Sequence, residues 1–318
     1  MRYFDVLILG GGPAGLTAGL YAGRALLKTA VIERGVWGGQ MATTEDIENY
    51  PGFPNGGVTG PGLSELMRQQ TAEFGTELII DEIEEVKAVD EGFAAKGYDD
   101  TYVGRALIIA TGASPRQLGA KGEDDFRGRG VSYCATCDGP FYKDKEIVIV
   151  GGGDSAVDEA LYMTRFAKAI TIIHRRDELR AEKIMQERAF KEPKIKFLWS
   201  HVVEEIKGNG EVRAVQVRNL KTGQASDFPT QGVFVYVGMN PNTGLVQELV
   251  KLNAGGYVCT ERDGSTSRAG VFAAGDVDNV RLRQVTNSVG MGAVAATSAI
   301  RYLEELDFAR AEAVQRSK

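Results

Sequence analysis

The sequence has 318 residues, of which 43% are hydrophobic, and its formal net charge at pH 7 is −6. This size allows more than one hydrophobic core, and the negative charge argues against a nucleic acid partner because no long lysine and arginine tract offsets it. No apolar run approaches the roughly 18 residues of a membrane helix, the three cysteines do not suit a secreted disulfide scaffold, and the first predicted strand leaves no room for a signal peptide, so we expect a cytoplasmic protein.

The first predicted element is a short apolar strand at residues 6–9, followed by a glycine-rich turn and an Ala/Leu-rich helix. The turn reads Gly10-Gly11-Gly12-Pro13-Ala14-Gly15, a G-x-G-x-x-G sequence. Such glycines let the backbone approach a pyrophosphate, which lies at the N-terminus of the helix. The next strand ends at Glu33, where a carboxylate can accept a hydrogen bond from the 2′-hydroxyl of an adenosine ribose. This pattern predicts a site for FAD or NAD.

A cysteine pair follows in the sequence Cys134-Ala135-Thr136-Cys137-Asp138. A disulfide that closes so short a loop stabilises the fold by only about 2 kcal/mol, against about 4.7 kcal/mol for a 100-residue loop. Redox exchange is therefore the better explanation, and Asp138 is placed to donate and accept the protons of that exchange, unless it is simply a surface acid. Zinc would need a second ligand pair, but only Cys259 and two histidines remain, so we expect no metal site.

A second copy of the strand, turn and helix pattern begins at residue 147. Its turn reads Gly151-Gly152-Gly153-Asp154-Ser155-Ala156, and the offset from Gly10 to Gly151 carries Glu33 onto His174. The ribose acid is thus replaced by His174, Arg175 and Arg176, with Arg180 one turn further on. Guanidinium groups match a phosphate dianion, so we interpret this cationic cluster as a site for the 2′-phosphate of NADPH. A solvated basic turn is the alternative interpretation.

The order of the predicted strands indicates one domain inserted into another. An apolar strand at 106–110 ends before a break at Pro115, and a turn-rich stretch at 238–244 makes the return crossing. We expect domains at 1–114 with 245–318 and at 115–244, in an α/β fold of two Rossmann-like three-layer domains, the second inserted into the first. A strand at 271–276 and a helix at 284–306 complete the first domain, and the charged tail beyond Asp307 is expected to fray.

These motifs together resemble those of the low-molecular-weight thioredoxin reductases over essentially the whole chain. The resemblance rests on the Cys134–Asp138 motif inside the second domain, the second glycine turn and the His-Arg-Arg run, with further matches at Gly38-Gly39-Gln40, at 48–52 and at Gly275-Asp276. It implies a homodimeric thioredoxin-disulfide reductase with FAD and NADPH as cofactors and thioredoxin as protein substrate. It also implies that Cys137 lies nearest the flavin, that Cys134 attacks the substrate disulfide, and that the inserted domain rotates during turnover.

The resemblance also implies two sets of binding residues. Those for FAD are Gly10, Gly12, Pro13, Ala14, Gly15, Glu33, Gly39, Gln40, Asn49, Ala110, Thr111, Gly112, Gly275, Asp276, Arg283, Gln284 and Val285. Those for NADPH are Gly151, Gly153, Asp154, Ser155, Ala156, His174, Arg175, Arg176 and Arg180.

Three other functions are compatible with parts of the pattern. The chain could reduce another thioredoxin-like protein or serve a peroxiredoxin system, although a peroxiredoxin reductase usually carries thioredoxin-like folds before the first strand, which we do not expect here. A ferredoxin-linked relative would usually lack the His-Arg-Arg run. A flavin-binding redox sensor is a non-enzymatic alternative, against which the intact cysteine motif argues.

Overall fold

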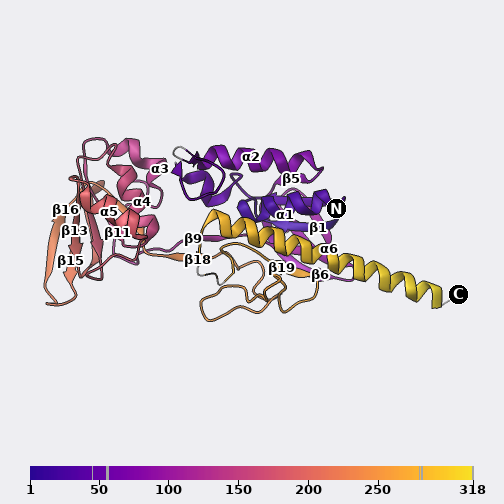
Figure 1. Cartoon of the computed structure of the whole chain (residues 1–318). Helices are drawn as coiled ribbons and strands as arrows, with labels where there is room; N and C mark the ends of the chain where they lie inside the picture. The colour runs from indigo at the N-terminus through magenta and orange to yellow at the C-terminus, as the bar shows by residue number, and fades with distance from the viewer. Residues whose placement is uncertain (45, 55–56, 279, 281, 317–318) are drawn as a thin grey trace. The chain divides into compact units, whose positions relative to one another are not determined.

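The computed structural model describes residues 1–44, 46–54, 57–278, 280 and 282–316. It forms two compact units, of which unit 1 comprises Met1–Ser114 with Pro241–Lys318, and unit 2 comprises Pro115–Asn240. In Figure 1, unit 1 therefore carries both ends of the colour scale and unit 2 carries the magenta-to-orange middle. The return crossing lies between Asn240 and Pro241 rather than after Gly244.

The earlier return crossing has a local cause. The two linkers are short strands, β9 (Ala113–Pro115) and β18 (Met239–Pro241), that pair with each other. Beyond them Asn242 is already tied into unit 1, since its side-chain amide donates to the carbonyl of Thr111 at 2.8 Å. The turn residues 242–244 thus belong with unit 1 and not with the inserted unit.

Unit 1 is built on a seven-stranded sheet of order β5-β2-β1-β8-β7-β6, with β19 also pairing with β8. Strands β5, β2, β1, β8 and β19 are parallel, whereas β7 pairs antiparallel with both β6 and β8. The strands are β1 (Arg2–Leu9), β2 (Thr29–Glu33), β5 (Glu77–Ile80), β6 (Ile83–Val89), β7 (Gly92–Gly97), β8 (Thr101–Ile109) and β19 (Val271–Ala273). Outside the sheet lie α1 (Pro13–Arg24), α2 (Gly60–Glu73), α6 (Val285–Arg316), η1 (Gly39–Thr43) and the β3–β4 pair (Asp46–Ile47, Val58–Thr59).

Side chains of β1 alternate between two apolar cores, as the period of a strand requires. Val6 and Ile8 pack with alanines of α1 and α6, while Leu7 and Leu9 pack on the other face with Phe93 and the segment around Val246. Both faces of the parallel sheet are therefore covered, which explains why the strand is apolar throughout. Helices α1 and α6 come close because Gly292 faces the Ala14 carbonyl, where a Cβ would lie 2.2 Å away.

Unit 2 contains a five-stranded parallel sheet of order β10-β17-β11-β12-β13. Its strands are β10 (Val131–Ser132), β11 (Glu146–Gly151), β12 (Ala169–His174), β13 (Ile195–Trp199) and β17 (Val233–Tyr236). One core packs the sheet against helical residues, and the other packs it against an antiparallel sheet. The remaining elements are α3 (Ala135–Asp138), η2 (Gly139–Tyr142), α4 (Asp154–Met163), α5 (Lys183–Lys191), β14 (His201–Asn209), β15 (Glu211–Asn219) and β16 (Ala225–Pro229).

The predicted fold class is confirmed, with one correction at the C-terminal helix. Helix α6 continues to Arg316 instead of ending near residue 306. The charged stretch after Asp307 contains alanine, glutamate and arginine but no glycine or proline, so intrinsic propensity sustains the helix where the apolar pattern stops.

Candidate redox and nucleotide sites

The first glycine turn joins β1 to α1 and leaves space for a ligand at one position only. At Gly10, where φ is +106°, a Cβ would lie 2.3 Å from the Ala110 carbonyl oxygen, and at Gly15 it would lie 1.8 Å from that of Gly10. At Gly12 the nearest atom would be 3.9 Å away. The outer two glycines are thus required by the chain's own packing, and the middle one keeps a cradle open at the helix N-terminus. This donor set fits a pyrophosphate.

Glu33 lies at the end of β2 beside this turn. Its carboxylate accepts hydrogen bonds from the backbone N–H groups of Gly11, at 2.7 Å, and Gly35, at 2.9 Å. These bonds fix its orientation, and the remaining lone pairs can accept hydrogen bonds from ribose hydroxyls. The Trp37 ring packs against this turn at Gly11, where an added Cβ would lie 2.5 Å from the ring.

Three of the other FAD-site candidates, Asn49, Gln284 and Gln40, form side-chain hydrogen bonds within unit 1. The amide of Asn49 donates to the Gln284 side-chain oxygen at 3.0 Å, and the Gln40 amide donates to the Ala113 carbonyl at 2.8 Å. Pro13, Ala14 and Gly15 form the first turn of α1, Gly39 and Gln40 open η1, and Val285 opens α6. The segment Ala110–Gly112 follows β8, and Gly275 adopts a φ of +80° after β19.

Asp276 follows Gly275 and is half-buried. Burial raises the pKa of its carboxyl group, and the charge of Arg283 acts in the opposite direction. No hydrogen bond reaches this carboxylate from the residues that the structure describes, so a polar ligand would satisfy it. Arg283 itself lies over the Tyr257 ring, 5.1 Å from its centroid.

Asn242 is a residue of this region that the sequence analysis treated only as part of a turn. Its backbone carbonyl accepts from the Thr111 hydroxyl at 2.7 Å, and its side-chain oxygen accepts from the Ser114 hydroxyl at 2.7 Å. Its side-chain amide also donates to Thr111, and its backbone N–H donates to the Gly112 carbonyl. Asn242 therefore holds the segment 111–114 in place. The Asn-Pro-Asn sequence at 240–242 was the only signal for it.

The second glycine turn, between β11 and α4, repeats the geometry of the first. A Cβ on Gly151, where φ is +155°, would lie 2.4 Å from the Tyr236 carbonyl oxygen. At Gly153 the nearest atom would be an Arg180 side-chain nitrogen, 3.9 Å away. Asp154 begins α4 and accepts a hydrogen bond from the Glu182 backbone at 2.7 Å. Ser155 is exposed and Ala156 is buried on the core side.

His174 differs from the three arginines of the cationic cluster in being buried. Its side chain is 4% exposed, and a Cβ on Gly152 would lie 2.5 Å from its ring. Burial lowers the pKa of the imidazole, and the charges of Arg180, Arg176 and Arg175 lower it further. The ring is therefore neutral near pH 7. It packs against the second glycine turn as Trp37 packs against the first, and its buried Nε2 has no hydrogen-bond partner among the described residues. Its contact with a 2′-phosphate stays a prediction.

Arg175, Arg176 and Arg180 are exposed, and within the described part of the chain none of them forms an ion pair. A shallow pocket of about 200 Å³ lies beside the first two, and Ser200, Leu220 and Lys221 also line it. The neighbouring Asp177 is instead paired with Lys221 at 3.0 Å. These arginines are thus available to an anionic ligand.

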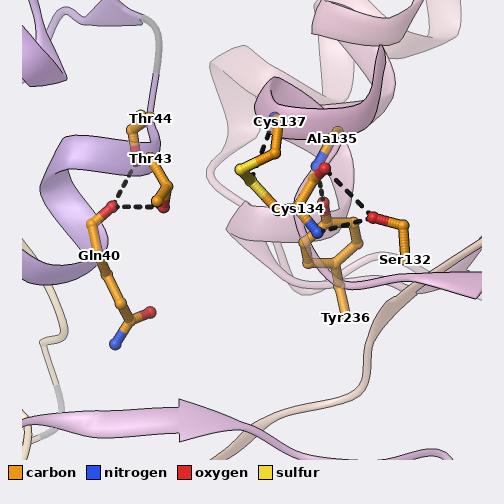
Figure 2. The surroundings of a disulfide bond; sticks show 8 residues. All are labelled: Gln40, Thr43, Thr44, Ser132, Cys134, Ala135, Cys137 and Tyr236. Atoms are coloured by element: carbon orange, nitrogen blue, oxygen red, sulfur yellow. Dashed lines mark hydrogen bonds between the residues drawn. A yellow bond between two sulfur atoms is a disulfide. The ribbon is translucent and has the colours of Figure 1, made fainter. Parts of the chain in front are cut away.

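Cys134 and Cys137 are joined by a disulfide at the start of α3. Figure 2 shows the hydrogen bonds around it. The Cys134 sulfur accepts from the Cys137 backbone N–H at 3.1 Å, and the Ser132 hydroxyl accepts from the Cys134 N–H at 3.0 Å. The Tyr236 hydroxyl accepts from the Ala135 N–H at 2.9 Å. Cys137 and Asp138 lie in α3, the former exposed and the latter half-buried, as is Cys134.

Comparison with known proteins decides the family of the chain. The profile of the pyridine nucleotide-disulphide oxidoreductases matches residues 4–292. The chain belongs to this family.

Within the family, the chain is similar to the thioredoxin reductases. It is 48% identical over 306 residues to a thioredoxin reductase of Listeria innocua, covering 96% of this chain and 95% of the relative. It is likewise 48% identical to that of Bacillus subtilis, covering 96% of both. The crystal structure of Lactococcus lactis thioredoxin reductase superposes with a TM-score of 0.93 at 44% identity, covering 95% of this chain and 99% of the other. The predicted resemblance to low-molecular-weight thioredoxin reductases is confirmed.

Membership of the pyridine nucleotide-disulphide oxidoreductases implies the use of a flavin and a pyridine nucleotide. This agrees with two open glycine cradles and one redox disulfide in a single chain. Among the described residues, no group of three or more histidine, cysteine or acidic side chains is arranged to hold a metal ion. Nor does any helix in that part of the chain have the length and apolar character needed to cross a membrane.

Proposed function

We propose that this chain is an NADPH-dependent thioredoxin-disulfide reductase with FAD as its cofactor. The observation that carries the proposal is that one compact unit holds both the Cys134–Cys137 disulfide and an open glycine cradle flanked by unpaired arginines. A homodimer in the cytoplasm belongs to the same proposal.

FAD fits the donor set of unit 1. The turn at Gly12 would take the pyrophosphate, Glu33 the adenosine ribose and Asp276 the polyol chain, with Asn49 and Gln284 beside the ring system. When bound, FAD supplies the two-electron chemistry that links a hydride donor to a disulfide. The chain's own contribution is to place polar groups where these parts of the cofactor need partners.

NADPH fits the donor set of unit 2 as the electron-donating substrate. The turn at Gly153 would take its pyrophosphate, and Arg175 and Arg176 would pair with its 2′-phosphate. Arg180 lies beside the turn, because its side-chain nitrogen is 3.9 Å from the Cβ position of Gly153. A nucleotide that lacks the 2′-phosphate would leave the arginines without a partner.

The dithiol carries two electrons to the protein substrate. After the Cys134–Cys137 disulfide is reduced, the Cys134 thiolate attacks one sulfur of the substrate disulfide and forms a mixed disulfide, displacing a substrate thiolate. The Cys137 thiolate then attacks the Cys134 sulfur, displaces the second substrate thiolate and restores the original disulfide. Asp138 donates the protons that the two substrate thiolates gain, and it accepts protons from the enzyme thiols when they ionise. The N–H of Cys137 stabilises negative charge on Cys134.

The two linker strands, β9 and β18, are proposed to act as the hinge between the units. The disulfide lies in unit 2, and a bound NADPH would also be held there, whereas FAD would be held by unit 1. Because the nicotinamide and the disulfide would each have to reach the flavin, we infer that the units turn relative to one another about β9 and β18. A covalent cross-link between the units should then stop steady-state thioredoxin reduction. Full turnover in the cross-linked protein would contradict the rotation.

One assay tests the proposed function as a whole. The purified protein should be yellow and should consume NADPH at a substantial rate only when an oxidised thioredoxin is present. A panel of thioredoxins and other small dithiol proteins from the same source would identify the acceptor. Activity with reduced ferredoxin but not NADPH would favour the ferredoxin-linked alternative, and FAD binding without turnover on any acceptor would favour a sensor.

A further inference from the structure

Tyr236 connects the redox motif to the second glycine turn. It is the last residue of β17, where it pairs with Gly151. Its carbonyl oxygen closes the space beside Gly151, and its hydroxyl accepts the 2.9 Å hydrogen bond from the Ala135 N–H (Figure 2). One side chain thus reaches from the end of a core strand to the peptide that directly follows Cys134.

The hydrogen bond from the Ala135 N–H to Tyr236 satisfies a backbone N–H that has no access to water. Ala135 is completely buried, so without the Tyr236 hydroxyl its N–H would have no partner in solvent. On the other side of Cys134, the Ser132 hydroxyl accepts from the Cys134 N–H and donates to the Cys134 carbonyl at 3.2 Å. The peptides before and after Cys134 are therefore both held by side chains.

The fixed backbone has a consequence for the Cys134 sulfur, which accepts the Cys137 N–H at 3.1 Å. A hydrogen bond to a thiolate is charge-assisted and stabilises it more than the thiol. The ionisable groups that act on Tyr236 from the surrounding elements are Glu159 and Asp158 of α4 and Asp138 of α3. Burial and the charge of Asp158 raise the pKa of Glu159 to about 8, so this carboxyl is largely protonated near pH 7. None of these three groups is a cation that could stabilise a thiolate, so the thiolate depends on the Cys137 N–H donor being held in place.

We propose that Tyr236 is a positioning residue for the redox dithiol: by holding the Ala135 N–H, its hydroxyl keeps Cys134 where the Cys137 N–H can stabilise the thiolate. The inference rests on the proposed function in one respect, that Cys134 is the attacking sulfur. Burial and the charge of Glu159 raise the pKa of the Tyr236 phenol, so its hydroxyl remains a neutral acceptor throughout the physiological range.

The test uses the FAD-containing protein carrying Tyr236→Phe, which removes one oxygen atom and leaves the ring in its core. After reduction with a phosphine, the alkylation of each cysteine by iodoacetamide is followed against pH by peptide mass spectrometry. We expect Cys134 in the variant to react roughly tenfold more slowly near pH 7, with its profile displaced to higher pH, because the loss of one buried hydrogen bond corresponds to about that factor. A Cys134 profile identical to that of the parent protein would overturn the proposal.

Two controls separate this effect from a general loss of structure. Cys259, in unit 1 and half-buried, should keep its alkylation profile in the variant. Tyr102→Phe removes another buried tyrosine hydroxyl, bonded to Asp81 at 2.8 Å, and should leave the Cys134 profile unchanged. An equal effect of Tyr102→Phe on Cys134 would also overturn the proposal. Because alkylation requires no thioredoxin, its result is independent of whether the parent protein reduces thioredoxin.

Discussion

The side-chain amide of Asn49 donates a hydrogen bond of 3.0 Å to the side-chain oxygen of Gln284, although 235 positions separate them in the sequence. The bond joins the segment after β3 to the residue that precedes α6. The Thr286 hydroxyl is also directed at the Asn49 carbonyl, 3.5 Å away. The two residues proposed to lie beside the flavin ring system are therefore hydrogen-bonded to each other.

This pairing predicts non-additive effects on flavin affinity. Asn49→Ala and Gln284→Ala should each weaken FAD binding by roughly 2- to 10-fold, as expected for one exposed hydrogen bond, and the double variant should lose less than the product of the two. FAD fluorescence titration of the apoproteins measures all four dissociation constants. Strict additivity would show that each residue acts on the flavin without the other.

A second prediction concerns the cradle at Gly12. Gly12→Val should yield a folded protein without FAD, because the added methyl groups point into the open space that the pyrophosphate needs and not into the protein. Absorbance at the flavin band and circular dichroism measure these two properties separately. Gly244→Val is the matched control, since a Cβ there also meets open space but lies outside the turn. Stoichiometric FAD in the Gly12 variant would remove the first glycine turn from the proposed site.

The roles of the two sulfurs can be separated by trapping. Cys134→Ser and Cys137→Ser should each abolish thioredoxin reduction while NADPH still bleaches the flavin. Only the protein that retains Cys134, the Cys137→Ser variant, should form a stable mixed disulfide with oxidised thioredoxin, because Cys134 holds the stabilised thiolate. Non-reducing electrophoresis detects the adduct. An adduct formed by Cys134→Ser instead would reverse the assignment, and the greater exposure of Cys137 makes this comparison necessary.

Asp138→Asn tests the proposed proton transfer. It keeps the size of the side chain and removes its ability to ionise, so thioredoxin reduction should slow by about 10²-fold while reduction of the flavin by NADPH keeps its rate. Stopped-flow absorbance resolves the two half-reactions. Asp124→Asn, on an exposed acid of the same unit, is the control. Unaltered turnover in the Asp138 variant would make this residue a surface acid.

The parts of the site that could be predicted from the sequence are those determined by elements that follow one another directly along the chain. The glycine turns and Glu33 follow from a strand, a turn and a helix in succession, and the chain folds them as expected. The burial of His174 was not predicted, because it depends on Gly152 and Trp199, which only the folded sheet brings beside it. Tyr236 and Asn242 were missed for the same reason, since each contacts a segment more than 100 residues away.

The most discriminating prediction concerns the arginines beside the second cradle. If Arg175 and Arg176 hold a 2′-phosphate, replacing either with alanine removes a charge-assisted contact, and the KM for NADPH should rise by roughly 10- to 150-fold. Both side chains are exposed, so solvent screening should place the effect toward the lower figure. NADH lacks the phosphate and should be used as poorly as before, so the ratio of kcat/KM for the two nucleotides should fall toward one.

Steady-state kinetics with both nucleotides measures this ratio, and Arg213→Ala provides a matched control on an exposed arginine of β15 in the same unit. The pattern across the two nucleotides decides between the explanations. Equal losses with NADPH and NADH would mean that the arginines support the fold of the loop after β12, because a structural defect cannot distinguish the nucleotides. Unchanged kinetics with NADPH would mean that its 2′-phosphate lies elsewhere, and the second cradle would then need another ligand.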